Sequence, residues 1–343
     1  MIAETPAPAA PLAVHHPLRG ALLLTLAVLV LACMDAATKQ LTAHYNVPLV
    51  VAVRYVVHAL IMVIALTPRQ GRQLVRTRRT GLVLARAASL TVASLFMGLA
   101  LQRMPVAETT AINFLSPMVV VLLAGPFLGE RVGWLSWTAG LTGFAGVVLI
   151  ARPGGGLDAS GIAFALCAAA ANTAYQILSR LLAGTERAAT LMFYTALVGA
   201  IVFGALLPWF WYGEAPGIGT LLVFASVGAT AALGHYLFTL SYRDAPASTL
   251  APLNYLQLLW AGMLGWLVFG HVPDAVSFVG LGVVAASGAL IAVAARARRS
   301  GAPQVSGIGK QPMVVLQDEG RDHGHGRRGA ALLRLLERLL KGA

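Results

Sequence analysis

The chain has 343 residues, of which 58% are hydrophobic and only 11% are charged. A soluble domain could not bury that much apolar surface, so the composition excludes a soluble protein and indicates a polytopic membrane protein. The formal net charge is +12, but the Lys and Arg residues lie in short clusters between apolar runs, as juxtamembrane charges do, which argues against nucleic acid as a partner.

Apolar runs of about the 20 residues that cross a bilayer recur along the chain. We expect ten transmembrane helices, near residues 18–40, 47–67, 80–101, 105–125, 133–151, 159–182, 188–211, 217–241, 246–268 and 273–295. The predicted fold class is therefore an all-α polytopic membrane protein. Before these helices, residues 1–17 are rich in Ala and Pro without periodicity, which predicts a disordered cytoplasmic tail.

The predicted spans contain an internal repeat. The stretch that begins at Pro105 aligns without a gap to the stretch that begins at Pro246, and the same offset pairs Asn113 with Asn254. Because this offset continues on both sides of the two stretches, most of the chain is an internal duplication.

The two copies, residues 18–151 and 152–296, each hold five spans. Because five is odd, the copies must enter the membrane in opposite directions. This inverted-topology plan recurs in secondary transporters, which place the substrate site near the bilayer midplane where the repeats meet. With the N-terminus inside, most Lys and Arg residues of the loops fall on the same side, so we expect both termini to be cytoplasmic.

Residues 297–343 are a polar tail that ends in GAALLRLLERLLKGA. The leucines of this stretch fall on one helical face and its charged residues on the other, a pattern typical of a helix that docks on the anionic inner leaflet. A frayed tail without a role is the alternative.

Ionisable side chains within spans cost about 2.5–3.5 kcal/mol each and by default indicate function. Asp35 and Lys39 lie one helical turn apart on the first span, where they can pair, and Arg54 and His58 have the same spacing on the second span. Arg54 could receive a carboxylate or phosphate in bidentate fashion, and Asp35 could hold a cationic substrate group or a coupling proton. The alternative is that these groups satisfy one another and lock the helices together.

Two other charged residues lie nearer the ends of their spans. Glu108 is one turn inside the fourth span, at the same predicted outer end as the charged group of the first two spans. We interpret it either as a member of that group or as a structural partner. Arg86 is closer to the cytoplasmic end of the third span, and we interpret it as an interfacial anchor.

Proline and glycine are expected to shape three spans. Pro117, four residues after Asn113, removes a backbone hydrogen bond, so we expect a kink at midplane depth that frees a carbonyl group. The glycines suited to close packing of the fifth and tenth spans are Gly140, Gly143, Gly146, Gly280 and Gly282.

The second repeat lacks the charges of the first, since Asp35 maps to Gln176 and Arg54 to Thr195. Including residues from both repeats, the remaining candidate substrate-binding residues are Asn113, Tyr175, Gln176, His235, Asn254, Tyr255 and Trp260. A cavity with one charged side and one side rich in amides and aromatics fits a polar metabolite with a flat ring. Core or lipid-facing packing is the alternative for each aromatic, and an interhelical hydrogen bond is the alternative for the two asparagines.

Three short motifs connect the chain to a known family: Leu128-Gly129-Glu130-Arg131, Arg152-Pro153-Gly154-Gly155 and Ala245-Pro246-Ala247-Ser248. With the ten spans and the inverted repeat, they resemble the EamA-type branch of the drug/metabolite transporter superfamily over residues 18–296. The resemblance implies carriage of small metabolites across the bacterial inner membrane without ATP. The second repeat of that family often ends in Gly-Glu, whereas this chain has Gly270-His271.

Within the family, the Asp35/Lys39 pair followed by Arg54-Tyr55 looks most like the branch with riboflavin or S-adenosylmethionine-type cargo. The leading hypothesis is a secondary transporter that works by alternating access, driven by a proton gradient or by the gradient of its cargo. The alternatives are an exporter of amino acids or drug-like amphiphiles and, remotely, a membrane sensor or scaffold that acts through its C-terminal tail.

An enzyme is not expected, and neither a cofactor nor a metal ion is implied. The sequence contains no convincing metal cluster, no paired carboxylates in a long loop and no extramembrane domain that could hold a donor nucleotide.

Overall fold

The computed structural model describes residues 17–128, 134–152, 156–182, 185–210, 216–244 and 250–300. The regular secondary structure of these ranges is helical throughout. The helices are α1 (Pro17–Thr42), α2 (Val47–Gln70), η1 (Gly71–Leu74), α3 (Thr80–Arg103), α4 (Val106–Asn113), α5 (Leu115–Leu128), α6 (Trp134–Ile150), α7 (Ala159–Leu182), α8 (Ala188–Phe210), α9 (Ile218–Asp244), η2 (Ala251–Tyr255), α11 (Leu256–Phe269) and α12 (Ala275–Ser300).

The predicted all-α fold with ten spans is confirmed. Within the described residues, six helices are long and apolar enough to cross a membrane by length and composition: α1, α2, α3, α7, α8 and α9. The four remaining spans correspond to shorter apolar helical stretches, at 106–120, 137–150, 253–269 and 275–290. The predicted N-terminal tail up to residue 16, the amphipathic C-terminal helix and the family motif residues Gly129–Arg131 lie outside the described residues.

The fourth and ninth spans are broken at matching positions. α4 ends at Asn113 and α5 begins at Leu115, while η2 ends at Tyr255 and α11 begins at Leu256. Leu115 and Leu256 are counterparts under the offset that pairs Asn113 with Asn254. Each repeat therefore contributes one interrupted span, and the interruption falls at the same point of the repeat.

Pro117 explains the break in the first repeat. Its ring nitrogen cannot donate to the carbonyl of Asn113, four residues earlier, and its ring crowds that carbonyl. The predicted kink is confirmed, but the helix is interrupted three residues before the proline, at Phe114. The expectation of a freed carbonyl is wrong, because the Asn113 carbonyl accepts a hydrogen bond of 2.7 Å from the Ser116 hydroxyl.

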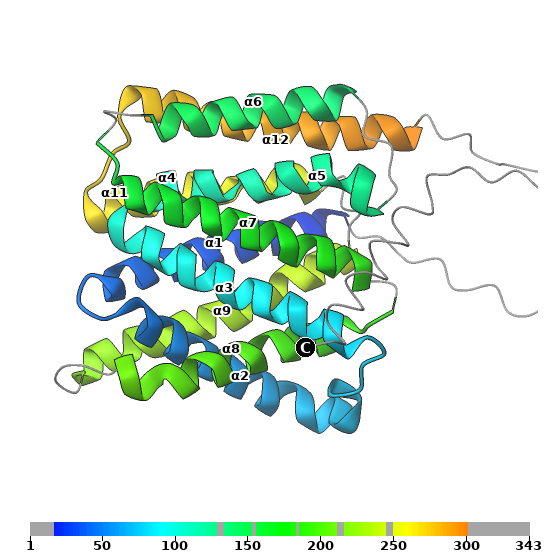
Figure 1. Cartoon of the computed structure of the whole chain (residues 1–343), viewed down its shortest axis with the longest axis vertical. Helices are drawn as coiled ribbons and strands as arrows, with labels where there is room; N and C mark the ends of the chain where they lie inside the picture. The colour runs from blue at the N-terminus through cyan, green and yellow to red at the C-terminus, as the bar shows by residue number, and fades with distance from the viewer. Residues whose placement is uncertain are drawn as a thin grey trace, which may run out of the picture.

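Helix packing follows the repeat symmetry (Figure 1). α1 packs on α9, and their counterparts α7 and α3 pack on each other in the same way. α2 packs on its own counterpart α8, and α6 on its counterpart α12. In Figure 1, α1 starts at the right-hand end of the molecule and α7 at the left-hand end, so the two repeats run in opposite directions. The predicted inverted repeat is therefore confirmed.

The contact between α6 and α12 depends on glycine. A Cβ atom added to Gly280 would lie 2.9 Å from the carbonyl oxygen of Gly146, and a Cβ atom on Gly146 would lie 3.0 Å from that of Gly280. The expected close packing is confirmed at these two positions. Gly282 differs, since a Cβ atom there would meet open space.

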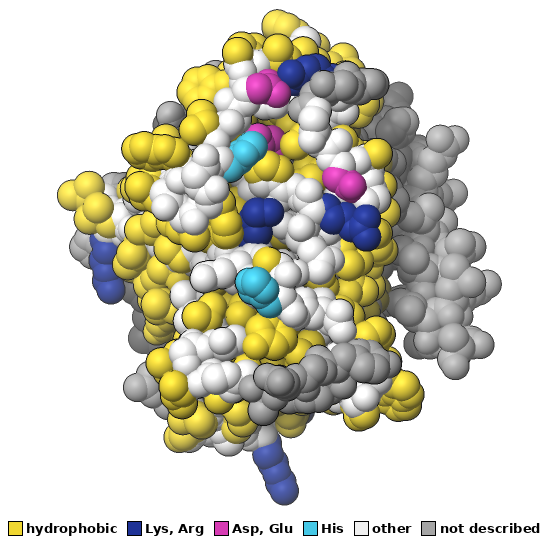
Figure 2. Space-filling model, turned by 90° about the vertical axis from the view of Figure 1, so that its left-hand side faces the viewer, with side chains coloured by type: hydrophobic (Ala, Val, Ile, Leu, Met, Phe, Trp, Pro, Cys, Tyr) yellow, Lys and Arg dark blue, Asp and Glu magenta, His cyan; other side chains and the backbone are white. Residues whose placement is uncertain are grey.

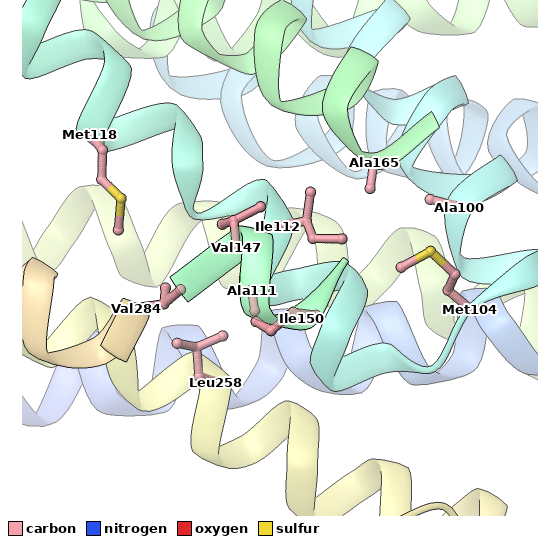
Figure 3. Close-up of a cluster of buried hydrophobic side chains, with 10 residues drawn as sticks. All are labelled: Ala100, Met104, Ala111, Ile112, Met118, Val147, Ile150, Ala165, Leu258 and Val284. Carbon is pink, nitrogen blue, oxygen red and sulfur yellow. The ribbon is translucent and has the colours of Figure 1, made fainter. Parts of the chain in front are cut away.

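The largest cluster of buried hydrophobic side chains lies where the two repeats interlock (Figure 3). It joins residues of α3, α4, α5, α6, α7, α11 and α12, including Ile112, Leu258 and Val284. The cluster contains residues from both halves of the fourth span and therefore packs them together. Among the described residues, it contains no residue of α1, α2 or α9, whose polar residues form a separate group.

Candidate functional site

Asp35 on α1 and Arg54 on α2 are buried, with 5% and 8% of their surfaces exposed. The Asp35 carboxylate accepts a long hydrogen bond of 3.4 Å from the side-chain amide of Gln257 on α11. Arg54 lies within electrostatic range of Asp35, but the two make no direct ion pair. Across the described residues, the guanidinium of Arg54 has no hydrogen-bond or ion-pair partner and lies 5.1 Å from the ring centroid of Tyr55. Its donors are therefore available to a ligand.

Two histidines from different repeats adjoin this pair. His58 on α2 and His235 on α9 stack with ring centroids 6.1 Å apart and planes inclined by 8°. The Nε2 atom of His58 is buried without a partner among the residues that the structure describes. Both histidines interact electrostatically with Arg54. The structure thus brings four of the predicted site residues together: Asp35, Arg54, His58 and His235.

Arg86 is not an interfacial anchor, and that interpretation is wrong. Its side chain is 6% exposed and lies between α3, α7 and α8. It donates hydrogen bonds to the Ser179 hydroxyl at 2.7 Å, to the Leu191 carbonyl at 3.0 Å, to the Thr195 hydroxyl at 2.9 Å and to the Tyr175 hydroxyl at 2.8 Å. Because α3 packs against both α7 and α8, the arginine points between helices rather than toward the lipid headgroups.

Tyr175, a predicted substrate-binding residue, is engaged by Arg86. Besides accepting the hydrogen bond, its ring lies under the guanidinium, 4.4 Å from centroid to charge centre. Gln176, the next residue on α7, is half-buried. Arg86 also interacts electrostatically with His235, which links this second arginine to the cluster around Arg54.

Lys39 does not pair with Asp35 as predicted. Its Nζ atom donates to the carbonyl oxygens of Leu101 at 2.9 Å and Met104 at 2.7 Å, at the C-terminal end of α3. These carbonyls have no partner within the helix, so a cation there is favourable. Lys39 therefore ties α1 to α3 instead of forming an ion pair with Asp35.

Glu108 and His271 are in contact at the same end of the molecule. The buried Glu108 carboxylate lies 3.0 Å from Nε2 of His271, whose side chain is 37% exposed. Figure 2 views this end, where Lys or Arg, Asp or Glu, and His side chains appear as a few separate groups among polar and hydrophobic ones. His271 occupies the place where the related family often has Glu, and sequence reasoning missed its pairing with Glu108.

The helix breaks of the two repeats are joined by an aromatic contact. The ring of Tyr255 faces that of Phe114 at a centroid distance of 4.9 Å and also lies against Gly288 of α12. Asn113 and Asn254 are half-buried, at the end of α4 and within η2. Tyr255 is thus packed against two other spans, the fourth and the tenth.

Trp260 lies one turn beyond Leu256 on α11. It packs against a small cluster that includes Leu24 and Val28 of α1 and Phe238 of α9. Its indole Nε1 atom is buried without a hydrogen-bond partner in the described part of the chain. An indole N–H usually finds a partner when it is buried, so this donor is also available to a ligand.

Gln257, Ser179 and Thr195 complete the polar network, and sequence reasoning did not single out Ser179 or Thr195 as candidates. Thr195 is the counterpart of Arg54 in the second repeat, and Gln257 lies one turn before Trp260. The signal that could have found Ser179 is its spacing of four residues from Tyr175, which places both on one face of α7. Their partner Arg86 could be assigned only from the packing of α3 on α7.

Two aspartates cap helices at the end of the molecule seen in Figure 2. Asp158 accepts a hydrogen bond of 2.7 Å from the backbone N–H of Gly161, and Asp274 accepts one of 2.8 Å from that of Ser277. The backbone N–H of Ser277 and then the Arg152 guanidinium, 3.0 Å away, hold the pKa of Asp274 below its usual range. Both caps stabilise the start of a second-repeat span.

An inverted pair of five-span repeats with ionisable groups buried between them defines a multi-pass membrane transporter. The chain belongs to the EamA-like transporter family, whose model matches residues 18–152 and again residues 159–293. The second match is displaced from the first by the same interval that separates Pro105 from Pro246, so the family model finds the repeat that the sequence shows.

Relatives with assigned cargoes are similar over half of the chain or more. It is 27% identical to a riboflavin transporter of Vibrio cholerae over 282 residues, covering 81% of this chain and 94% of that protein. It is 29% identical to a riboflavin transporter of Rhizobium johnstonii over 270 residues, covering 77% and 88%. An S-adenosylmethionine uptake transporter of Rickettsia bellii is 25% identical over 170 residues, which is 50% of this chain and 58% of that protein.

A solved crystal structure shares the fold. It superposes with a TM-score of 0.60 at 19% identity, over 82% of this chain and 98% of the other. Taken with the family and its relatives, the chain is a transporter of a small metabolite.

Proposed function

We propose that this transporter carries a polar, flat-ringed metabolite of the riboflavin or S-adenosylmethionine type across the bacterial inner membrane, as a secondary transporter and not as an enzyme. The observation that carries the proposal is the cluster of Asp35, Arg54, His58 and His235 inside the bundle, because a buried arginine without a partner is costly unless a ligand uses it. The names of the relatives support the cargo class.

The ligand-binding groups divide by chemistry. Arg54 offers a guanidinium fork, Asp35 offers an acceptor, and the indole N–H of Trp260 offers a second donor. The other proposed substrate contacts are Lys39, His58, Asn113, Tyr175, Gln176, His235, Asn254 and Tyr255. A ring that enters between α1, α2, α9 and α11 would exchange contacts with water for contacts with these side chains.

Alternating access follows from the inverted repeats. The interrupted fourth and ninth spans meet through Phe114 and Tyr255, so rocking one repeat against the other about this contact would open each end in turn. Asp35 is the proposed carrier of a coupling proton. Both termini are proposed to be cytoplasmic, with the helix near residues 330–341 docked on the anionic inner leaflet.

The test is uptake into proteoliposomes that contain the purified full chain. Labelled riboflavin and S-adenosylmethionine are supplied with and without a proton gradient. Arg54→Ala is expected to reduce flux to background while the protein still inserts and elutes as the wild type does. The matched control is Arg103→Ala, which removes an arginine that bonds to Ser160 at the exposed end of α3. Wild-type flux in Arg54→Ala would remove Arg54 from the site, and absence of flux for every compound would overturn the proposed function.

A further inference from the structure

The buried charges of the described residues do not balance. The buried ionisable side chains are Asp35, Arg54, His58, Arg86 and Glu108, and Lys39 is half-buried. If Arg86 faced the lipid headgroups, as the sequence suggests, the two acids Asp35 and Glu108 would balance the charges of Lys39 and Arg54. With Arg86 buried, the set holds three basic side chains, Lys39, Arg54 and Arg86, and two carboxylates, Asp35 and Glu108.

One part of this set is neutralised locally. Glu108 interacts electrostatically with Lys39, and its Oε1 atom lies 3.0 Å from Nε2 of His271, which carries a charge only when it is protonated. These groups lie at the end of the molecule where α3 meets α4. The remaining charges of this set are Asp35 and the two arginines, so the excess positive charge comes from Arg54 on α2 and from Arg86, which lies between α3, α7 and α8.

Arg86 is hydrogen-bonded but not neutralised. Its acceptors among the described residues are three hydroxyl oxygens and one backbone carbonyl oxygen, none of which carries a charge. The positive charge of a guanidinium persists at any physiological pH. Arg86 therefore adds a fixed positive potential, and its electrostatic interaction with His235 shows that this potential extends toward Arg54's neighbours.

Arg54 lacks even neutral partners in the described part of the chain. Asp35 is the carboxylate within its electrostatic range, and it is hydrogen-bonded to Gln257 instead of forming an ion pair with Arg54. His58 and His235 add no negative charge in any protonation state. Asp35 is thus the carboxylate within range of Arg54, both guanidinium groups act electrostatically on His235, and the guanidinium with free donors is that of Arg54.

We propose that the cargo of this transporter carries an anionic group, a carboxylate or a phosphate, which binds Arg54 in the positive potential of Arg86. This inference rests on the proposed function and specifies its substrate class. A planar guanidinium binds either group through two parallel N–H···O bonds, and a buried charge is stable when it is paired. Of the two cargoes named for the relatives, S-adenosylmethionine has a carboxylate and riboflavin has neither group.

The experiment compares ligands that differ only in the anionic group. The purified full chain is titrated with riboflavin and flavin mononucleotide, and separately with decarboxylated S-adenosylmethionine and S-adenosylmethionine, with thermal stabilisation as the readout. The anionic member is expected to bind at least about tenfold more tightly in at least one pair, as one charge-assisted bidentate contact implies. Arg54→Gln should remove this preference, and Arg103→Gln should keep it.

Three results overturn the inference: equal affinities within each pair, a preference that survives in Arg54→Gln, or no binding by any of the four compounds. The wild-type comparison needs no variant, so a misfolded Arg54→Gln protein does not prevent a decision. Proteoliposome flux separates the two proposals. Flux of a neutral flavin without preference for its phosphate overturns the anion inference and leaves the proposed function standing, whereas no flux of any compound overturns the proposed function.

Discussion

Phe114 and Tyr255 are counterparts in the two repeats, and their rings are in contact, with centroids 4.9 Å apart and planes inclined by 36°. Residues that a twofold operation exchanges can touch each other only near its axis. The contact therefore marks the pseudo-twofold axis, and it places the axis between the breaks of the fourth and ninth spans. A rocking motion of one repeat against the other would therefore change the contact between these two rings.

The two rings are expected to be energetically coupled. In a double-mutant cycle of Phe114→Ala and Tyr255→Ala, the interaction energy should be about 0.5–1.5 kcal/mol, the value for aromatic pairs beyond their area burial. The measurement is reversible unfolding of the protein in mixed micelles. Phe114→Ala combined with Phe224→Ala, whose ring contacts Tyr45 on another part of the bundle, is the control and should be additive. Additivity in the first cycle would contradict a functional contact at the axis.

Gly280 and Gly282 lie two residues apart on α12 and should respond oppositely to alanine. Gly280→Ala places a methyl group 2.9 Å from the Gly146 carbonyl oxygen, and such overpacking costs about 1–3 kcal/mol. Gly282→Ala meets open space, so the higher helix propensity of alanine leaves stability unchanged or raises it by up to about 1 kcal/mol. Thermal unfolding in detergent distinguishes the two. Equal effects of the two substitutions would contradict the close contact between α6 and α12.

Tyr175→Phe tests the Arg86 network. The change removes the hydroxyl that accepts from the guanidinium and leaves a buried charged N–H without a partner, at a cost of about 1–3 kcal/mol. Tyr194→Phe is the matched control, because the Tyr194 hydroxyl donates to the Val75 carbonyl at an exposed position. Thermal unfolding should show a clear loss for the first variant and little for the second. Equal melting temperatures would place Arg86 elsewhere.

The cap formed by Asp274 makes stability depend on pH. The backbone N–H of Ser277 and then Arg152 lower the pKa of Asp274 in the folded protein. A lowered pKa means that folding favours the ionised form, so this stabilisation is present above the ordinary value of about 3.9 and is lost as the pH falls through the folded value. Asp274→Asn should therefore melt below the wild type at neutral pH, and the difference should disappear in acid. A difference that does not change with pH would show that the charge is irrelevant.

Local features of the sequence predict the architecture well. The bounds of the spans follow from apolar length, and α7 begins and ends at the predicted residues 159 and 182. The constant offset between matching residues predicts the inverted repeat, because duplication preserves spacing. Pro117 predicts the kink of the fourth span, because a missing backbone donor acts within one helical turn.

The partners of the charged residues could not be predicted in the same way. Asp35 and Lys39 have the spacing of a helical pair, yet Lys39 bonds to carbonyls on α3 and Asp35 to Gln257 on α11. Such partners are chosen by the packing of spans that are far apart in the chain. A sequence pattern describes one helix at a time and does not show which helix covers it.

The Arg86 network has a consequence for how the protein is made. All four of its acceptors belong to α7 and α8, between 89 and 109 residues later in the chain. When α3 leaves the translocon, Arg86 has none of them, and an arginine inside a span costs up to about 2.5–3.5 kcal/mol to insert. The first repeat therefore waits in the bilayer with an unsatisfied charge until two spans of the second repeat have been synthesised. Stable insertion of the third span therefore requires the second repeat. Expression of the first repeat alone should yield a poorly inserted third span.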